Sequence, residues 1–358
     1  MTMKAIYDIL KNKELFSFQL QYAETDFLFS SDSKSEVEFL KDFFSSSCCF
    51  DQLASSYVWK IYSVQFAVPS ELKQSFLKNS YVEDYWDNQQ IRVSKHTKSQ
   101  YVFQLDFNND NFTFLDLEQK VIFFIKPRVD DMYNEHLIHI LREALKYESK
   151  AKGYIDIHGA ALSYQDKNLL IVGPKGCGKT TLLTYFLKKK ATYVSNDSAR
   201  LSMTGNVPIL YAWPHYLRLG KDTVYSDELL QQYIRTRNIP IGKDDKFLLT
   251  TKDICEAYDI SNIKCCSLDY ILIPKIQIGS ENFQVERADV GEDSIANLFQ
   301  DTKRVGLIPC ENYDHFNHIS NKTLNIFLNT SPKCLRVVYG TKSEDHLVDM
   351  IMSACMNL

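Results

Sequence analysis

The chain has 358 residues and a net charge of −4, with 45% hydrophobic and 24% charged residues. This length suits two domains at roughly 150 residues each, and the composition is typical of a soluble globular protein. The small negative charge argues against nucleic acid or an anionic membrane surface as the main partner.

Cysteine usage and the first residues bear on the cellular compartment. The nine cysteines are an odd number, and the adjacent pairs Cys48–Cys49 and Cys265–Cys266 lack the spacing of a zinc site or a disulfide framework. They predict reduced thiols in a cytoplasmic protein. Residues 1–16 lack the apolar core of a signal peptide, and no apolar run reaches the roughly 18 residues of a transmembrane helix.

Residues 1–130 are predicted to form a β-rich N-terminal domain. Apolar residues alternate or cluster as in strands in four segments, 16–29, 57–68, 101–107 and 120–125. Segments rich in serine or asparagine predict loops at residues 30–35, 45–47 and 108–111. No group of residues in this half has the pattern of a catalytic site, so we expect a scaffold or recognition domain.

Residues 131–152 are predicted to connect this domain to a second one. The apolar residues between Leu137 and Leu145 recur at helical spacing, which predicts a helix over residues 131–149. The second domain is predicted to span residues 153–358. It begins with a strand-like hairpin whose turn lies at residues 165–168.

A glycine-rich loop follows the apolar run 169–172. The loop and the start of the predicted helix comprise Gly173, Pro174, Lys175, Gly176, Cys177, Gly178, Lys179, Thr180 and Thr181, which match the P-loop spacing. Glycine tolerates positive φ, so successive N–H groups can form an anion site. Lys179 would reach the β- and γ-phosphates of ATP, and Thr180 would hold Mg²⁺. The alternative is an ordinary strand-to-helix turn, but three of only 12 glycines fall in this loop.

Two further candidates follow the loop. The strand-like run 191–197 ends in an acidic residue, Asp197, where a second Mg²⁺ contact is expected. Asp197 is therefore a candidate metal ligand and catalytic residue, and its alternative is a turn residue. Arg218 has a planar donor fork that suits a phosphate, although a surface position fits it equally.

The rest of the chain carries no diagnostic motif. The charged segment 222–248 is predicted to be a solvated loop or a mobile arm over the site. Strands are predicted at residues 270–273 and 335–339, and helices at 294–299 and 343–355.

Residues 157–200 resemble the catalytic domain of HPr kinase/phosphorylase and related serine kinases with a phosphoenolpyruvate-carboxykinase-like nucleotide site. The resemblance rests on His158-Gly159, the loop from Gly173 to Thr180, and the strand end Val194-Ser195-Asn196-Asp197, in this order. Weaker similarity over residues 153–300 points to a subgroup with an Asn-Asp pair. The resemblance implies an α+β or α/β fold, with a P-loop domain of mixed sheet and flanking helices.

The same resemblance implies a function and site roles. It implies ATP-dependent transfer of the γ-phosphoryl group to a hydroxyl, typically a serine of a protein or peptide, with Mg²⁺ as cofactor. Asn196 stands where the family has its general base, and an amide cannot accept that proton, so Asp197 would be metal ligand, base or both. His158 would orient the nucleophile or the phosphate, and its alternative is a strand histidine without a catalytic role.

Thr181 stands where bifunctional relatives carry Glu. This departure, like Asn196, argues against the reverse phosphorylase activity and puts metal binding in question. Relatives form rings, so the resemblance also implies a homo-oligomer.

The sequence is compatible with three functions. In the leading hypothesis, a kinase, Lys179 and Arg218 stabilise charge on the transferring phosphoryl group and Asp197 lies near the acceptor. The acceptor would be a peptide or protein serine, such as that of a biosynthetic precursor peptide, or a small-molecule alcohol. The second hypothesis is a nucleotide-binding regulatory module without phosphotransfer, and the third is an ATPase coupled to a partner.

Overall fold

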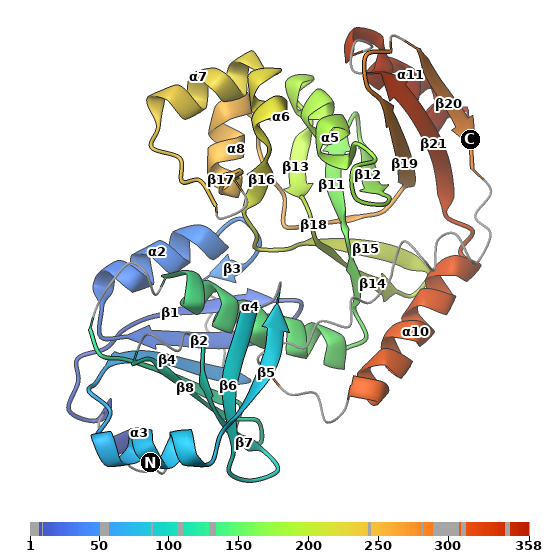
Figure 1. Cartoon of the computed structure of the whole chain (residues 1–358). Coiled ribbons are helices and arrows are strands. Elements are labelled where there is room, and N and C mark those ends of the chain that lie inside the picture. Colours follow the sequence, from blue (N-terminus) through green and yellow to red (C-terminus); the bar gives the residue numbers. More distant parts are fainter. Residues whose placement is uncertain are drawn as a thin grey trace. The chain divides into compact units, whose positions relative to one another are not determined.

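The computed structural model (Figure 1) describes residues 7–8, 10–50, 57–86, 89–105, 110–128, 134–242, 245–280, 282–288, 308, 313–340 and 344–357. The chain divides into two compact units. The first comprises Met1–Ser149 with Lys303–Tyr313, and the second comprises Lys150–Thr302 with Asp314–Leu358.

The first unit is built on a nine-stranded sheet. Its elements are β1 (Phe16–Tyr22), β2 (Thr25–Ser31), α2 (Lys34–Phe44), β3 (Cys49–Phe50), β4 (Trp59–Gln65), α3 (Ser70–Lys78), β5 (Tyr81–Trp86), β6 (Gln89–Lys95), β7 (Gln100–Gln104), β8 (Phe112–Asp116), β9 (Val121–Lys126) and α4 (Asn134–Ala151). The strand order is β3-β1-β2-β4-β9-β8-β7-β6-β5. Strand β4 pairs in parallel with β2 and β9, and the other neighbours are antiparallel.

The centre of this sheet is covered on both faces. Every residue of β9 is buried, as expected for a strand with parallel pairing and helices on both sides. Phe123 packs in one cluster with Phe76 of α3, whereas the ring of Phe124 lies 6.3 Å from that of His136 in α4. Figure 1 shows α3 on one side of the sheet and α2 with α4 on the other.

Most strands predicted in this unit are confirmed. Segments 16–29, 57–68, 101–107 and 120–125 overlap β1 with β2, β4, β7 and β9, and residues 106–107 lie outside the described residues. The predicted helix is confirmed as α4, with Leu137 and Leu145 buried, and the loop at residues 45–47 is a turn after α2. Residues 108–109 of the turn at 108–111 lie outside the described residues. The loop predicted at residues 30–35 is wrong, because Ser31 ends β2 and α2 begins at Lys34.

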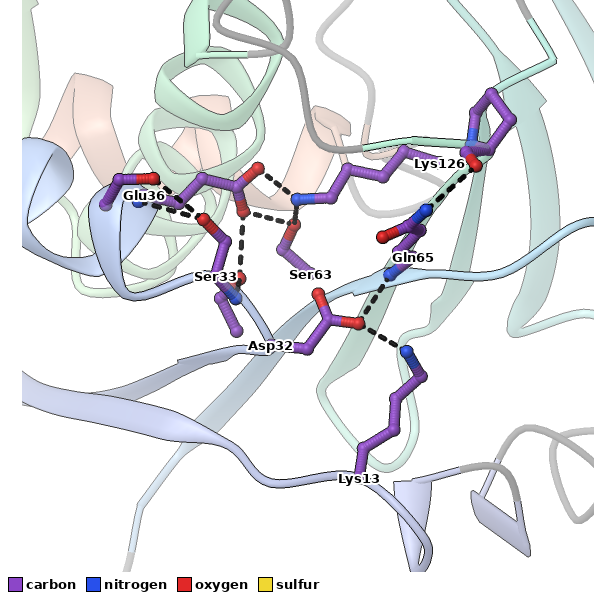
Figure 2. Close-up of polar contacts among 10 residues, drawn as sticks. Lys13, Asp32, Ser33, Glu36, Ser63, Gln65 and Lys126 are labelled. Carbon is purple, nitrogen blue, oxygen red and sulfur yellow. Dashed lines mark hydrogen bonds and ion pairs between the residues drawn. The ribbon is translucent and has the colours of Figure 1, made fainter.

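A buried ion pair explains why this serine-rich segment is structured. Lys126, at the end of β9, is fully buried and pairs with Glu36 of α2, which is also buried. Ser63 Oγ accepts a hydrogen bond from Lys126 Nζ at 3.0 Å and donates to Glu36 Oε2 at 2.9 Å (Figure 2). Ser31 Oγ donates to the same carboxylate oxygen at 2.9 Å. The serines thus satisfy buried charges instead of facing water.

The second unit contains the glycine-rich loop. Its elements are β10 (Ile155–Ile157), β11 (Gly159–Tyr164), β12 (Lys167–Val172), α5 (Lys179–Lys188), β13 (Thr192–Ser195), β14 (Ala199–Thr204), β15 (Val207–Ala212), β16 (Leu217–Leu219), α6 (Lys221–Tyr225), α7 (Glu228–Thr236), β17 (Phe247–Leu249), α8 (Thr251–Tyr258), β18 (Cys265–Ser267), β19 (Tyr270–Gln277), β20 (Phe283–Arg287), α10 (Tyr313–Asn329), β21 (Lys333–Gly340) and α11 (Glu344–Met356). These strands form sheets with the orders β13-β11-β12-β19-β21-β20, β10-β14-β15-β18 and β16-β17.

The six-stranded sheet of this unit has a core on each face. Leu169 and Ile171 of β12 belong to a cluster that includes side chains of α5 and α11. Their neighbours Leu170 and Val172 belong to a second cluster, with side chains of β14, β15 and α10. Alternation along one apolar strand therefore fills both cores, which explains the unbroken apolar run 169–172.

The solvated loop predicted for residues 222–248 is wrong, because α6, α7 and the start of β17 lie in this segment. Residues 243–244 lie outside the described residues, and the alternative of a mobile arm over the site stays a prediction. Helix α7 begins at an N-cap, Asp227, whose Oδ1 accepts hydrogen bonds from the N–H groups of Leu229 and Leu230 at 3.1 and 3.2 Å. The other oxygen of Asp227 accepts from the Tyr258 hydroxyl at 2.7 Å, which fixes α7 to α8.

The remaining predictions in this unit concern its C-terminal part and the fold class. The strands at 270–273 and 335–339 and the helix at 343–355 are confirmed as β19, β21 and α11, whereas residues 294–299 lie outside the described residues. Mixed sheets with flanking helices confirm the predicted α+β class.

The eight cysteines within the described ranges form no disulfide. In the described part of the chain, no helix combines the length and apolar character needed to span a bilayer.

The buried ion pair generates a stability prediction. Lys126→Met should lower the free energy of unfolding by about 3–5 kcal/mol, because the Glu36 carboxylate would stay buried without a cation. Adding Glu36→Met should recover much of this loss. The exposed pair Lys34–Glu38, at 3.6 Å, provides a control, and Lys34→Met should cost less than about 1 kcal/mol. Equal losses in urea unfolding for the two lysine variants would contradict the role of burial.

The two adjacent thiols of β18 give a second test. Burial raises the pKa of the Cys266 thiol to about 12, whereas Cys265 is exposed. Because the thiolate is the reactive form, iodoacetamide at pH 8 should modify Cys265 well before Cys266. Mass spectrometry of peptides from briefly treated protein measures the order. Faster modification of Cys266 would contradict the burial of its thiol.

Candidate functional site

Three segments with candidate residues meet at one edge of the six-stranded sheet. Strand β11 is antiparallel to both of its neighbours, β12 and β13. The start of β11 therefore lies beside the ends of β12 and β13. This edge carries His158 just before β11, the loop 173–178 after β12, and Asp197 just after β13.

The loop has the backbone conformation that its glycines allow. Gly173, Gly176 and Gly178 have φ values of +152°, +85° and +101°, a region that other residues rarely adopt. Gly178 is the N-cap of α5, and no side chain caps this helix. By contrast, the side chains of Ser33, Asp227 and Thr250 cap α2, α7 and α8. The first N–H groups of α5 are thus available to an anion rather than to a capping side chain.

Lys179, the first residue of α5, folds back over the loop. Its Nζ donates hydrogen bonds to the carbonyl oxygens of Gly173 and Pro174 at 2.8 and 3.1 Å. Burial lowers the pKa of the Lys179 ammonium, and the nearby Cys177 and Asp197 oppose this shift. Negative charge from a phosphate would act in the same direction as Asp197 and favour the charged lysine.

Strands β19 and β21 hold the end of the loop. The N–H of Ile276 donates to the carbonyl of Cys177 at 3.0 Å, and the hydroxyl of Tyr339 donates to the carbonyl of Gly178 at 2.7 Å. Burial raises the pKa of Tyr339, so its hydroxyl stays protonated and remains a donor. No signal in the sequence identifies either residue, because both look like ordinary apolar strand positions.

Asp197 and His158 contact each other at the sheet edge. Asp197 has a left-handed backbone with φ of +63°, and its side chain is 43% exposed. His158 Nδ1 lies 2.9 Å from the backbone oxygen of Asp197 and 3.5 Å from its Oδ1. Because a carbonyl oxygen only accepts, Nδ1 of His158 carries a hydrogen. The structure therefore brings together two residues, far apart in sequence, that were both predicted for the site.

His215 is a third residue at Asp197, and it was missed from the sequence. Its side chain is only 10% exposed, and its Nε2 lies 3.9 Å from Asp197 Oδ2. Its Nδ1 donates to the carbonyl oxygen of Tyr216 at 2.6 Å. A single histidine after a strand matches no motif, so only the proximity of His215 to Asp197 in the fold identifies it.

The segment that carries His215 is fixed by its neighbour Trp213. The N–H of Trp213 donates to Ser195 Oγ at 3.2 Å, which ties the segment to the end of β13. The guanidinium of Arg200 stacks on the Trp213 ring, with Cζ 3.8 Å from the ring centroid. Arg200 Nε also lies 2.9 Å from Asp156 Oδ1, an ion pair whose angle is too poor for a hydrogen bond.

The remaining predicted residues have well-defined places in the fold. Thr180 and Thr181 lie in the first turn of α5, and the Thr181 side chain hydrogen-bonds with Tyr339. Asn196 is buried beside Asp197. Arg218 is half-buried in the short strand β16, between two core leucines. The contact of Arg218 with a phosphate stays a prediction.

The residues at this edge suit a nucleotide with magnesium better than a metal held by protein alone. Within the described residues, no group of three or more His, Cys, Asp and Glu side chains could hold a metal ion. Mg²⁺ commonly uses one or two protein oxygens and completes its shell with phosphates and water. The Thr180 hydroxyl and the Asp197 carboxylate fit this arrangement in their chemistry.

Comparisons with known proteins give little support of their own. No family model and no curated protein matches the chain. Among solved structures, it is similar to the HPr(Ser) kinase/phosphatase from Coxiella burnetii, with 8% sequence identity and a TM-score of 0.29 over 56% of this chain and 96% of that chain. A TM-score of 0.29 does not establish a shared fold, so the family resemblance rests on the motifs between His158 and Asp197.

Two glycines of the loop give a matched test of its packing. A Cβ atom at Gly178 would lie 2.4 Å from the Tyr339 hydroxyl oxygen, whereas one at Gly176 would have no atom within 4 Å. Gly176→Ala should lower the free energy of unfolding by about 1–2 kcal/mol through its positive φ alone. Gly178→Ala should cost about 1–3 kcal/mol more through overpacking. Equal losses in denaturant unfolding would contradict close packing of the loop against β21.

Proposed function

We propose that the chain is an ATP-dependent kinase that transfers the γ-phosphoryl group to a hydroxyl, typically a serine of a peptide or protein. The observation that carries this proposal is the combination at one sheet edge of an uncapped helix N-terminus, a lysine and an exposed carboxylate. Lys179 starts the helix, and Asp197 is near enough to affect its pKa. Such an edge offers donors to a polyphosphate and an acceptor to the attacking group.

Each residue has a role in the proposed reaction. The loop N–H groups and Lys179 would bind the phosphates and stabilise charge on the group in transfer. Thr180 and Asp197 would hold Mg²⁺, which supplies further neutralisation of phosphate charge when bound. His158 donates to the backbone of Asp197 and so positions its carboxylate near the acceptor hydroxyl. Asn196 cannot act as the base, because a neutral amide takes up no proton.

The exposure of the site favours a large acceptor. The side chains of Asp197 and His158 are 43% and 50% exposed, so a serine on a peptide or protein could approach them without a change in the fold. A precursor peptide in a biosynthetic pathway would be such an acceptor, and a small-molecule alcohol would fit the same chemistry. The buried Asn196 favours a second candidate, a nucleotide-binding module in which the base has been lost.

Labelled ATP distinguishes these functions. The full chain with γ-labelled Mg·ATP and serine-containing peptides should yield labelled peptide. Lys179→Ala should lower the transfer rate by about 100-fold or more, because a charge on the phosphoryl group would lose its partner. Asp197→Asn should abolish transfer but leave ATP affinity within a few-fold. Equilibrium binding of Mg·ATP measures that affinity separately.

Lys189→Ala is a suitable control, because Lys189 is exposed at the C-terminal end of the same helix. It should transfer phosphate at the native rate. Binding of ATP without labelled product or phosphate release would instead support the nucleotide-binding module. Release of phosphate without a labelled acceptor would support a partner-coupled ATPase.

A further inference from the structure

We infer that Tyr339 is a positioning residue for nucleotide binding: its hydroxyl fixes the peptide group between Gly178 and Lys179 so that the Lys179 N–H points into the phosphate loop. The inference rests on the proposed function and adds to it a residue that lies about 160 positions from the loop in sequence. Tyr339 belongs to β21, and no motif in the sequence includes it.

Two carbonyl groups of the loop accept hydrogen bonds from donors outside the loop. The carbonyl of Cys177 accepts from the N–H of Ile276 at 3.0 Å, and the carbonyl of Gly178 accepts from the hydroxyl of Tyr339 at 2.7 Å. Ile276 and Tyr339 are direct partners in the register of β19 and β21. The two strands thus present one rigid pair of donors to two consecutive peptide groups.

The positions of these two carbonyl groups fix the directions of the N–H groups that follow them. In a planar trans peptide the carbonyl and the following N–H point in opposite directions, and the described residues contain no cis peptide. With the carbonyls of Cys177 and Gly178 turned toward β19 and β21, the N–H groups of Gly178 and Lys179 point away from these strands. Donors aligned in this way are the elements of an anion-binding nest.

The packing around Gly178 shows that this arrangement leaves little freedom. A Cβ atom at Gly178 would lie 2.4 Å from the Tyr339 hydroxyl oxygen and 2.9 Å from Ile276 Cβ. The Gly178 carbonyl also accepts from the N–H of Leu182 at 2.9 Å, the first hydrogen bond of α5. Tyr339 itself is fully buried. Its hydroxyl therefore acts on the loop from a fixed position.

Substitution by phenylalanine isolates the hydroxyl. Tyr339→Phe keeps the ring in the core and removes only the hydroxyl, which donates to the Gly178 carbonyl and also hydrogen-bonds with the Thr181 side chain. We expect the dissociation constant for Mg·ATP to rise about fivefold to tenfold, as when one hydrogen bond to a charged ligand is misaligned. Isothermal titration calorimetry on the full chain measures it.

The chain offers a closely matched control in the same sheet. Tyr270, also buried, donates its hydroxyl to the carbonyl of Cys355 at 2.7 Å. It lies six residues before Ile276 on β19, about 20 Å from the loop end of the strand. Tyr270→Phe should shift the urea midpoint as much as Tyr339→Phe but leave ATP affinity unchanged. A role of Tyr339 in stability alone predicts the same ATP affinity for both variants.

The outcomes separate this inference from the proposed function. If Tyr339→Phe binds Mg·ATP as the native chain does, or Tyr270→Phe weakens binding equally, the inference is overturned while phosphate transfer can still be observed. If the native chain binds ATP without transfer and only Tyr339→Phe weakens binding, the inference stands and the kinase proposal fails. A nitrogen-15 NMR titration with inorganic pyrophosphate adds a readout without turnover. The shift of the Lys179 amide should be smaller in Tyr339→Phe than in Tyr270→Phe.

Discussion

The candidate site depends on the position of β12 between antiparallel β11 and parallel β19. This position is fixed because β12 contributes side chains to a core on each face, and a shift of one residue would exchange the two sets. The pairing then determines where chain ends lie. The start of β11 and the ends of β12, β13, β19 and β21 come to one edge, and that edge carries His158, the glycine-rich loop and Asp197.

Contacts with β19 and β21 determine the conformation of the loop together with its glycines. Glycine can adopt the φ values at positions 176 and 178 because it has no side chain. This freedom does not explain why there is room for a Cβ atom at position 176 but not at position 178. At Gly178 the exclusion comes from Ile276 and Tyr339, whereas the space around Gly176 is open. The same loop therefore contains one glycine needed for conformation and one needed for conformation and packing.

Two charged clusters, one in each unit, differ in their exposure. In the first, Lys126 and Glu36 are fully enclosed and satisfied by serine hydroxyls, so they serve the packing of α2 on the sheet. In the second, the Asp197 side chain is 43% exposed and lies beside His158 and His215, and burial lowers the pKa of Lys179 in the loop. Only the second arrangement leaves an interaction for a charged ligand to complete.

The sequence by itself determined the elements with strong local signals. The apolar run and glycine spacing of residues 169–181 identified the strand, loop and helix, and helical spacing identified α4. Local signals failed where distant partners decided the structure: Ser31 ends a strand instead of lying in a loop, because it donates to the Glu36 carboxylate that pairs with Lys126. Only the tertiary structure placed His215 beside Asp197 and Tyr339 against Gly178, because sheet pairing joins residues whose separation along the chain carries no pattern.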